Sequence, residues 1–203
     1  MAKASAPARQ RTVIGPRRSM LIKTIITIVL ALIVMIGLTI LIIWLNIKPK
    51  RPIYYISGGS INNYTLTKDH HLYASYNLVL KSFNPNQKMH ILYKKMEIKI
   101  MYENVELASG VIDAWHQHKI EKREFKLDLV SHNVVLSEAV SGHLKLAKSL
   151  NQVVLDLELK SKIKSKLGIW KSRYYHMRVS CVNVVSQFSN SSKGCHGSCN
   201  TFL

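Results

Sequence analysis

Acidic residues are scarce in this chain of 203 residues, which has 11 Asp and Glu against 29 Lys and Arg and a formal net charge of +18. Acid–base catalysis commonly uses paired carboxylates in a pocket, and covalent catalysis needs a nucleophile beside a base. Asp156 and Glu158 share one face of an expected strand, but lysines follow them on that face, which suits cross-strand ion pairs. Because no catalytic signature is present, we expect a protein that is not an enzyme.

Residues that suit a metal or another cofactor are also few. A structural zinc site takes four ligands, and Cys195 with His196 and Cys199 forms a single short cluster that lacks a second half. His116 and His118 have the His-x-His spacing of some copper and zinc sites, but we expect them to be exposed imidazoles in a loop. The sequence therefore predicts neither a metal nor a cofactor.

The chain has only three cysteines, Cys181, Cys195 and Cys199, and all lie near the C-terminus. An oxidising compartment would permit a disulfide from Cys181 to either Cys195 or Cys199, and the odd number leaves one thiol unpaired or open to a partner chain. The alternative is that all three are reduced and structural. The pairing stays open at this point.

Charged residues are also missing between Lys23 and Lys48, where residues 24–47 are dominated by Ile, Leu and Val. As a helix this run extends roughly 36 Å, enough to cross a hydrocarbon core about 30 Å thick. A cleaved signal peptide has a shorter apolar region, of about 7 to 15 residues, and a buried core helix shows a polar stripe. We therefore expect a transmembrane signal-anchor helix over residues 21–47, after a basic cytoplasmic tail over residues 1–20.

More basic residues precede the apolar run than follow it. Those before it are Lys3, Arg9, Arg11, Arg17, Arg18 and Lys23, and those after it are Lys48, Lys50 and Arg51. Since basic flanks are retained in the cytoplasm, we predict a cytoplasmic N-terminus and an extracellular or lumenal C-terminal domain, at the plasma membrane or an endomembrane. Sequons at Asn63 and Asn190 agree with a glycoprotein on that side, where nucleic acid is not an expected partner.

Apolar and polar residues alternate through much of the chain after the apolar run. The clearest segments are residues 72–80, 96–102, 125–129, 153–167 and 175–181, separated by turn signals. Repeated strands at this spacing indicate an antiparallel β-sandwich, so we expect an all-β domain over residues 64–203 after a linker over residues 48–63. Residues 137–150 are compatible with a short helix or an irregular crossover, and Cys181 is expected to point inward.

Four lysines occupy alternate positions of the segment 153–167, namely Lys160, Lys162, Lys164 and Lys166. On a strand they form one solvent-facing row, which we interpret as a candidate polyanion-binding surface. Given the expected topology, the partners would be acidic cell-wall polysaccharide or anionic lipid headgroups. A merely solvated basic face is the alternative.

Several motifs occur in a characteristic order along the chain. They are Lys48-Pro49-Lys50-Arg51-Pro52, Phe83-Asn84-Pro85-Asn86, Trp115-His116-Gln117, Leu167-Gly168-Ile169-Trp170 and a strand that carries Cys181. Together with the basic tail and the apolar run, this order resembles the plant harpin-induced-like membrane proteins, which carry a late embryogenesis abundant type 2 domain. Trp115-His116-Gln117 departs from the usual Phe-Tyr-Gln of that family. The asparagines beside Pro85 are expected to cap a turn after a strand.

The resemblance implies a fibronectin-like sandwich preceded by one transmembrane helix. It also implies a single-pass plasma-membrane or endomembrane protein with a non-enzymatic interaction role, through protein partners, in plant defence or stress responses. The alternative function is a sandwich that binds or handles lipid, in its interior or at its basic rim near the membrane surface.

Overall fold

The computed structural model describes residues 16–47, 49–188 and 197–203. The chain divides into two compact units, Met1–Lys48 and Pro49–Leu203. The first unit contains helix α1, Pro16–Ile47. Its segment Met20–Ile42 has a mean hydropathy of 3.2 and is long and apolar enough to cross a membrane.

Three threonines of α1 direct their hydroxyls to the backbone of the helix itself. The hydroxyls of Thr24, Thr27 and Thr39 each donate to the backbone carbonyl four residues earlier, at 3.0, 2.9 and 2.7 Å. Such bonds leave no hydroxyl in need of water or of a neighbouring helix. The three threonines are therefore compatible with an apolar environment.

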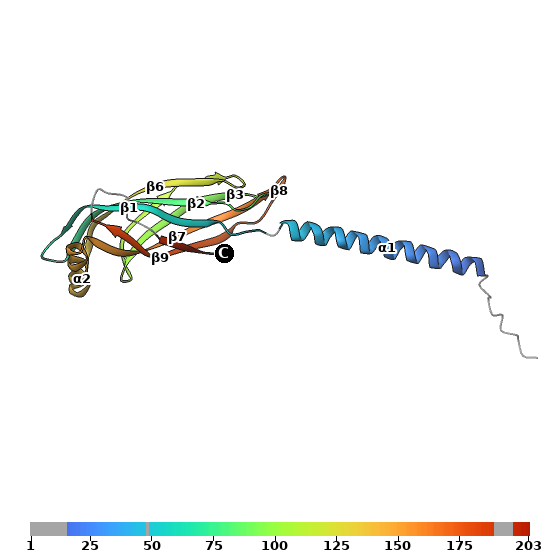
Figure 1. Cartoon of the computed structure of the whole chain (residues 1–203), viewed down its shortest axis with the longest axis horizontal. Coiled ribbons are helices and arrows are strands. Elements are labelled where there is room, and N and C mark those ends of the chain that lie inside the picture. Colours follow the sequence, from blue (N-terminus) through green and yellow to red (C-terminus); the bar gives the residue numbers. More distant parts are fainter. Residues whose placement is uncertain (1–15, 48, 189–196) are drawn as a thin grey trace, which may run out of the picture. The chain divides into compact units, whose positions relative to one another are not determined.

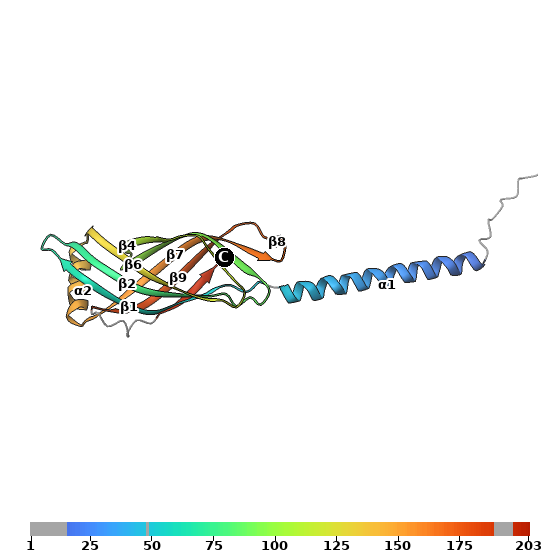
Figure 2. The same cartoon turned by 90° about the horizontal axis from the view of Figure 1, so that it is seen from above.

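The second unit is built from antiparallel strands and one short helix (Figures 1 and 2). The elements are β1 Ile53–Leu66, β2 His71–Phe83, β3 His90–Tyr102, β4 Val105–Ile112, β5 Trp115–Gln117, β6 Lys122–Val135, α2 Glu138–Ser149, β7 Gln152–Leu167, β8 Trp170–Lys171, β9 Tyr175–Gln187 and β10 Gly197–Phe202. The described strands form one ten-stranded sheet in the order β4-β3-β7-β9-β10-β1-β2-β6, with β5 on β3 and β8 on β7.

This sheet curls so that its two end strands, β4 and β6, come into direct contact. The hydroxyl of Ser131 on β6 donates to the carbonyl of Leu107 on β4 at 2.6 Å. Gly110 on β4 lies under Leu129 of β6 so closely that a Cβ at Gly110 would come within 2.2 Å of the Leu129 Cδ2 atom. The all-β, antiparallel sandwich expected from the sequence is confirmed.

In strand β7, the apolar residues of the alternating pattern face the core and the charged residues face outward. Leu155, Leu157, Leu159 and Ile163 are buried, and the charged residues between them lie on the outer face. Pairing with β3 on one side and β9 on the other makes this strand central in the sheet. The segment is one long strand, Gln152–Leu167.

Helix α2 covers one end of the sandwich, and β8 lies at the opposite end (Figures 1 and 2). The side chain of Ser137 accepts a hydrogen bond from the backbone N–H of Val140, which caps the helix start. Val140 and Leu144 are buried against the core, as expected of an amphipathic helix. Of the two alternatives for residues 137–150, the helix is correct.

The segment expected as a linker, residues 48–63, is mostly strand. Strand β1 begins at Ile53, and its residues Tyr54 and Ile56 are buried in the core. Gly58 and Gly59 are residues typical of a linker, but here they belong to the strand: the pairing register with β2 shifts between Ile56 and Gly58, where glycine accommodates a β-bulge. Residues 49–52 alone precede the strand in the described part of this unit.

Candidate functional site

The Asn-Pro-Asn motif fastens loops together at the β8 end of the domain. Asn84 is fully buried, and its Nδ2 donates to the carbonyls of Met89 at 3.0 Å and His118 at 2.8 Å. Asn86 pairs with the backbone of Lys50, accepting from its N–H at 2.7 Å and donating to its carbonyl at 2.8 Å. We call this arrangement the asparagine clasp. It joins the start of the domain to the β2–β3 and β5–β6 loops. Within the turn, the Oδ1 atom of Asn84 accepts from the N–H of Asn86 at 3.1 Å, which is the turn cap that the sequence predicted.

Gln117 extends the clasp into the core. Its Oε1 accepts from the hydroxyls of Tyr93 at 3.1 Å and Ser82 at 3.3 Å, and its Nε2 donates to the carbonyl of Glu121 at 3.1 Å. Burial raises the pKa of Tyr93, which keeps its phenol protonated as a donor. Trp115 stacks on the Tyr93 ring with centroids 4.1 Å apart. The Trp115-His116-Gln117 motif thus has one buried face of aromatic and amide side chains.

An open groove of about 1150 Å³ lies over the outer face of β3, β7 and β9. Its charged lining includes Lys160 and Lys162 from β7 and Arg178 from β9. Lys160 also contacts the carboxylate of Glu158 at 3.2 Å. We call this depression the basic groove. Of the four lysines predicted as a row, Lys160 and Lys162 line the groove, while Lys164 and Lys166 continue along β7 beyond its lining.

Two lysines of the basic groove were missed in the sequence. Lys94 and Lys95 are consecutive, exposed residues of β3, at a register shift between Tyr93 and Met96. The hydroxyl of Ser161 lies 3.2 Å and 3.3 Å from their two carbonyls and anchors this bulge to β7. The Lys-Lys pair interrupts the apolar alternation of the strand, and that interruption is the signal that could have identified a bulge.

The turn between β7 and β8 presents apolar side chains to solvent. Ile169 is 90% exposed and Trp170 is 76% exposed. Lys166 and Lys171 pair across the two strands beside this turn. Gly168 has φ of +56°, a conformation that glycine adopts without strain. The turn therefore combines an exposed indole with flanking cations.

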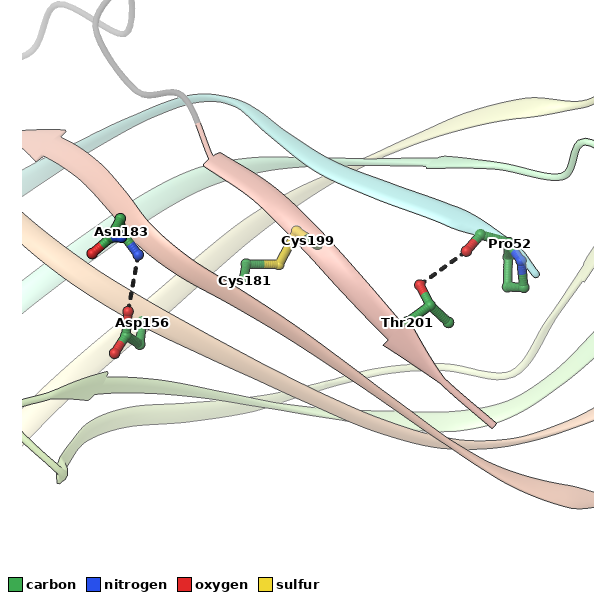
Figure 3. Close-up of a disulfide and its surroundings, with 6 residues drawn as sticks. All are labelled: Pro52, Asp156, Cys181, Asn183, Cys199 and Thr201. Carbon is green, nitrogen blue, oxygen red and sulfur yellow. Dashed lines mark hydrogen bonds between the residues drawn. A yellow bond between two sulfur atoms is a disulfide. The ribbon is translucent and has the colours of Figure 1, made fainter.

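A disulfide bond joins Cys181 of β9 to Cys199 of β10 (Figure 3). The two residues are direct register partners, and Cys181 is fully buried, as the alternation predicted. The structure thus contains one of the two pairings left open by the sequence, and Cys195 lies outside the described residues. Beyond the disulfide, the hydroxyl of Thr201 donates to the carbonyl of Pro52 at 2.9 Å, which ties β10 to the start of the domain.

Of the two sequons, the structure describes Asn63 but not Asn190. Asn63 is exposed on β1, with φ of 49°, next to a second register shift in the pairing with β2. Its side chain is therefore accessible for modification. Asn190 lies outside the described residues, so the predicted use of both sequons stays a prediction.

Three histidines come together on the outer face of the sheet at the β8 end. The potential ligand atoms of His90, His116 and His118 all lie within 4.8 Å of one another. Burial, and next the nearby His118, lower the pKa of His90 and of His116. The His-x-His spacing indicates only His116 and His118, because His90 is distant in the chain and joins them through the pairing of β3 with β5.

The fold and these features define a class: a small antiparallel sandwich that follows one candidate membrane span. A family profile described as "Late embryogenesis abundant protein" matches residues 79–181, half of the chain. The chain belongs to this family, which confirms the resemblance inferred from its motifs. The matched segment runs from within β2 to the disulfide residue Cys181 and contains the whole Asn-Pro-Asn motif.

Similar curated proteins come from Arabidopsis thaliana. "Uncharacterized protein At1g08160" is 29% identical over 83% of this chain and 78% of that protein. "NDR1/HIN1-like protein 26" is 25% identical over 73% of this chain and 71% of that protein. "NDR1/HIN1-like protein 3" is also 25% identical, over 85% of this chain and 76% of that protein. A solved structure titled "Crystal structure of protein from Archaeoglobus fulgidus" covers 63% of this chain and 96% of that chain at 10% identity, and its TM-score of 0.26 is too low to support an inference.

Proposed function

We propose that this protein is a membrane-anchored, non-enzymatic binding module that acts in plant defence or stress responses. Family membership and the NDR1/HIN1-like relatives support the plant defence or stress role. The apolar segment of α1 supports a single-pass anchor. In this proposal the helix is an uncleaved signal anchor, and the sandwich is displayed on the extracellular or lumenal side.

The Cys181–Cys199 disulfide supports that topology, because disulfides persist in oxidising compartments. The exposed position of Asn63 is compatible with a glycan. Protease protection in microsomes, scored together with a glycosidase mobility shift, tests the proposal. We expect a protected domain and a shift that Asn63→Gln and Asn190→Gln together abolish. Digestion of the domain from the cytoplasmic side, without a glycosidase shift, would contradict it.

The basic groove is the single observation that carries the binding role. Five cationic side chains line it, from Lys94, Lys95, Lys160, Lys162 and Arg178, against the carboxylates of Glu97 and Glu158. Alternate residues of a strand are about 6.6 Å apart, so the lysines of β7 form a regular row. A regular row of cations favours a linear polyanion, and acidic cell-wall polysaccharide is the partner that the proposed location offers.

Retention of the full-length protein on immobilised pectate tests this partner, with the protein in neutral-lipid nanodiscs. The variant Lys160→Glu/Lys162→Glu should lose retention at low salt. The matched control Lys126→Glu/Lys145→Glu changes the net charge equally at exposed sites away from the groove and should be retained. An equal loss of retention in both variants would show that net charge, and not the groove, is responsible.

A second candidate is contact with an anionic membrane surface, favoured by the exposed Ile169 and Trp170 beside Lys166 and Lys171. Indole side chains and cations are both typical of membrane interfaces. A lipid inside the sandwich is less well supported, because fully buried side chains such as Leu157 fill the space between the layers.

Shielding of Trp170 from aqueous quencher tests the second candidate. In a Trp44→Phe variant the emission comes from Trp115 and Trp170, and Trp115 is buried. Iodide quenching should fall when the protein is moved from neutral to phosphatidylserine-containing nanodiscs. A further Trp170→Phe substitution supplies the Trp115 background. Unchanged quenching in the two lipids would reject surface contact.

A further inference from the structure

The three histidines at the β8 end have the chemistry of a metal site. We propose that His90, His116 and His118 bind one divalent transition-metal ion of the zinc or copper(II) type. The proposal stands on the geometry of this cluster and is independent of the basic groove and of the membrane topology.

The spacing of the rings is close to that of a three-histidine site. Ring centroids lie 5.3 Å apart for His90 and His116, 5.2 Å for His90 and His118, and 4.6 Å for His116 and His118. Zinc–nitrogen bonds of about 2.0 to 2.1 Å place tetrahedral ligand atoms roughly 3.4 Å apart. The ligand atoms already lie within 4.8 Å, so side-chain rotations of the order of 1 Å complete the site.

The backbone beneath the rings is fixed by side chains of the clasp region. Asn84 bonds the carbonyl of Met89, the residue before His90, and also the carbonyl of His118. The carbonyl of His116 accepts from Arg123 Nη1 at 3.1 Å, and the N–H of His118 donates to the Glu121 carboxylate. Two chain segments far apart in sequence are thereby held in one register, which is the pre-organisation that a metal site needs.

One ring nitrogen of the cluster has no other role in the described structure. The Nδ1 atom of His90 is buried, and no hydrogen-bond partner for it occurs among the described residues. Buried polar atoms normally have a partner, because leaving one unsatisfied costs free energy. This unsatisfied nitrogen distinguishes His90 from an ordinary surface histidine, whose ring nitrogens are both in water.

The ligand set also predicts which ions bind. Imidazole nitrogens suit zinc, copper and nickel, whereas calcium and magnesium prefer oxygen ligands. Three protein ligands leave a fourth position for water or a partner group, which is typical of open sites. Lys119 and Lys166 add positive charge near His90, so the ion should be exchangeable and not a permanent structural component.

Metal titration of the full-length protein tests the proposal, using protein without a polyhistidine tag, in nanodiscs, with its thiols alkylated. Calorimetry should show one equivalent of Zn²⁺ bound and no response to Ca²⁺ or Mg²⁺. With Cu²⁺, electron paramagnetic resonance should show hyperfine coupling to three imidazole nitrogens. His118→Gln, at an exposed side chain, should weaken Zn²⁺ binding at least about tenfold and reduce the coupling to two nitrogens.

The matched control is His132→Gln, an exposed histidine outside the cluster, which should bind Zn²⁺ like the parent protein. The double variant His90→Gln/His118→Gln should bind no stoichiometric Zn²⁺, with its fold checked by circular dichroism. Unchanged Zn²⁺ affinity in His118→Gln, or Cu²⁺ coupling that the substitution does not alter, would overturn the proposal.

Discussion

The two ends of the sandwich are closed in different ways. At the α2 end, Val140 and Leu144 of an amphipathic helix pack against the core. At the β8 end, loops are joined by the asparagine clasp, whose amides bond backbone groups more than thirty residues away, as Asn84 does with His118 and Asn86 does with Lys50. Apolar covering tolerates side-chain exchange, whereas each amide must match particular donors and acceptors. The β8 end therefore depends on individual residues, and the candidate binding features gather beside it.

The largest loss of stability should come from removing the disulfide that joins β10 to β9, which would affect the domain beyond either end. Cys181→Ser/Cys199→Ser should lower the free energy of unfolding by about 3 kcal/mol, the value typical for a loop of this length. Urea unfolding of the sandwich in detergent, followed by near-ultraviolet circular dichroism, measures it. Cys195→Ser is the control that keeps the bond, and a double variant as stable as this control would contradict the prediction.

Breaking the clasp should be next in size. Asn84→Ala removes the donor that the carbonyls of Met89 and His118 share. Because these groups are left unsatisfied in the folded protein, we expect the free energy of unfolding to fall by about 2 kcal/mol. The same urea titration measures it. Hydrogen exchange should also rise in the loops 84–89 and 118–121 before it rises around α2. An equal rise in hydrogen exchange throughout the domain would show that the clasp stabilises the whole fold and not these loops in particular.

Loss of one polar group at the α2 end should lower the free energy of unfolding less than Asn84→Ala does. Ser137→Ala removes the helix cap and should cost about 1 kcal/mol, because Val140 and Leu144 continue to hold the helix. Thermal unfolding compared with Ser137→Asp, which retains a capping oxygen, measures the difference. A loss as large as that of Asn84→Ala would remove the contrast between the two ends.

The exposed turn between β7 and β8 should contribute least to stability. Ile169→Ser and Trp170→Ala remove side chains that are already in solvent, so the unfolding free energy should change by less than about 0.5 kcal/mol. The unfolding midpoint checks this. A large destabilisation would mean that these side chains pack in the folded protein and are unavailable to a membrane surface.

Much of the fold could be predicted because long stretches of its strands alternate. β7 places Val153, Leu155, Leu157 and Leu159 inward, and β9 does the same with Met177, Val179 and Cys181, so the faces of these stretches follow from the sequence alone. The alternation of β9 ends at Val182 and Asn183, which are both exposed. β1 was missed because Gly58 and Gly59 look like a loop when the pairing that stabilises a bulge is unknown. Turn chemistry identified the Asn-Pro-Asn loop, but not the backbone groups that its amides bind.

The candidate sites were less predictable, because they depend on which strands are neighbours. The lysines of β7 were found, since they lie on one strand, but Lys94 and Arg178 come from the strands on either side. His90 joins His116 only through the register of β3 with β5. Strand order and register are long-range properties that a local pattern does not contain.

The disulfide between Cys181 and Cys199 would hold the protein together after proteolysis between these residues. The residues between these cysteines are bridged at both ends by one covalent link, while β10 pairs with both β9 and β1. A protease that cleaves between them divides the polypeptide into two pieces but releases neither from the fold. Such a nicked protein would migrate as one species on a non-reducing gel, and its C-terminal fragment would separate only after reduction.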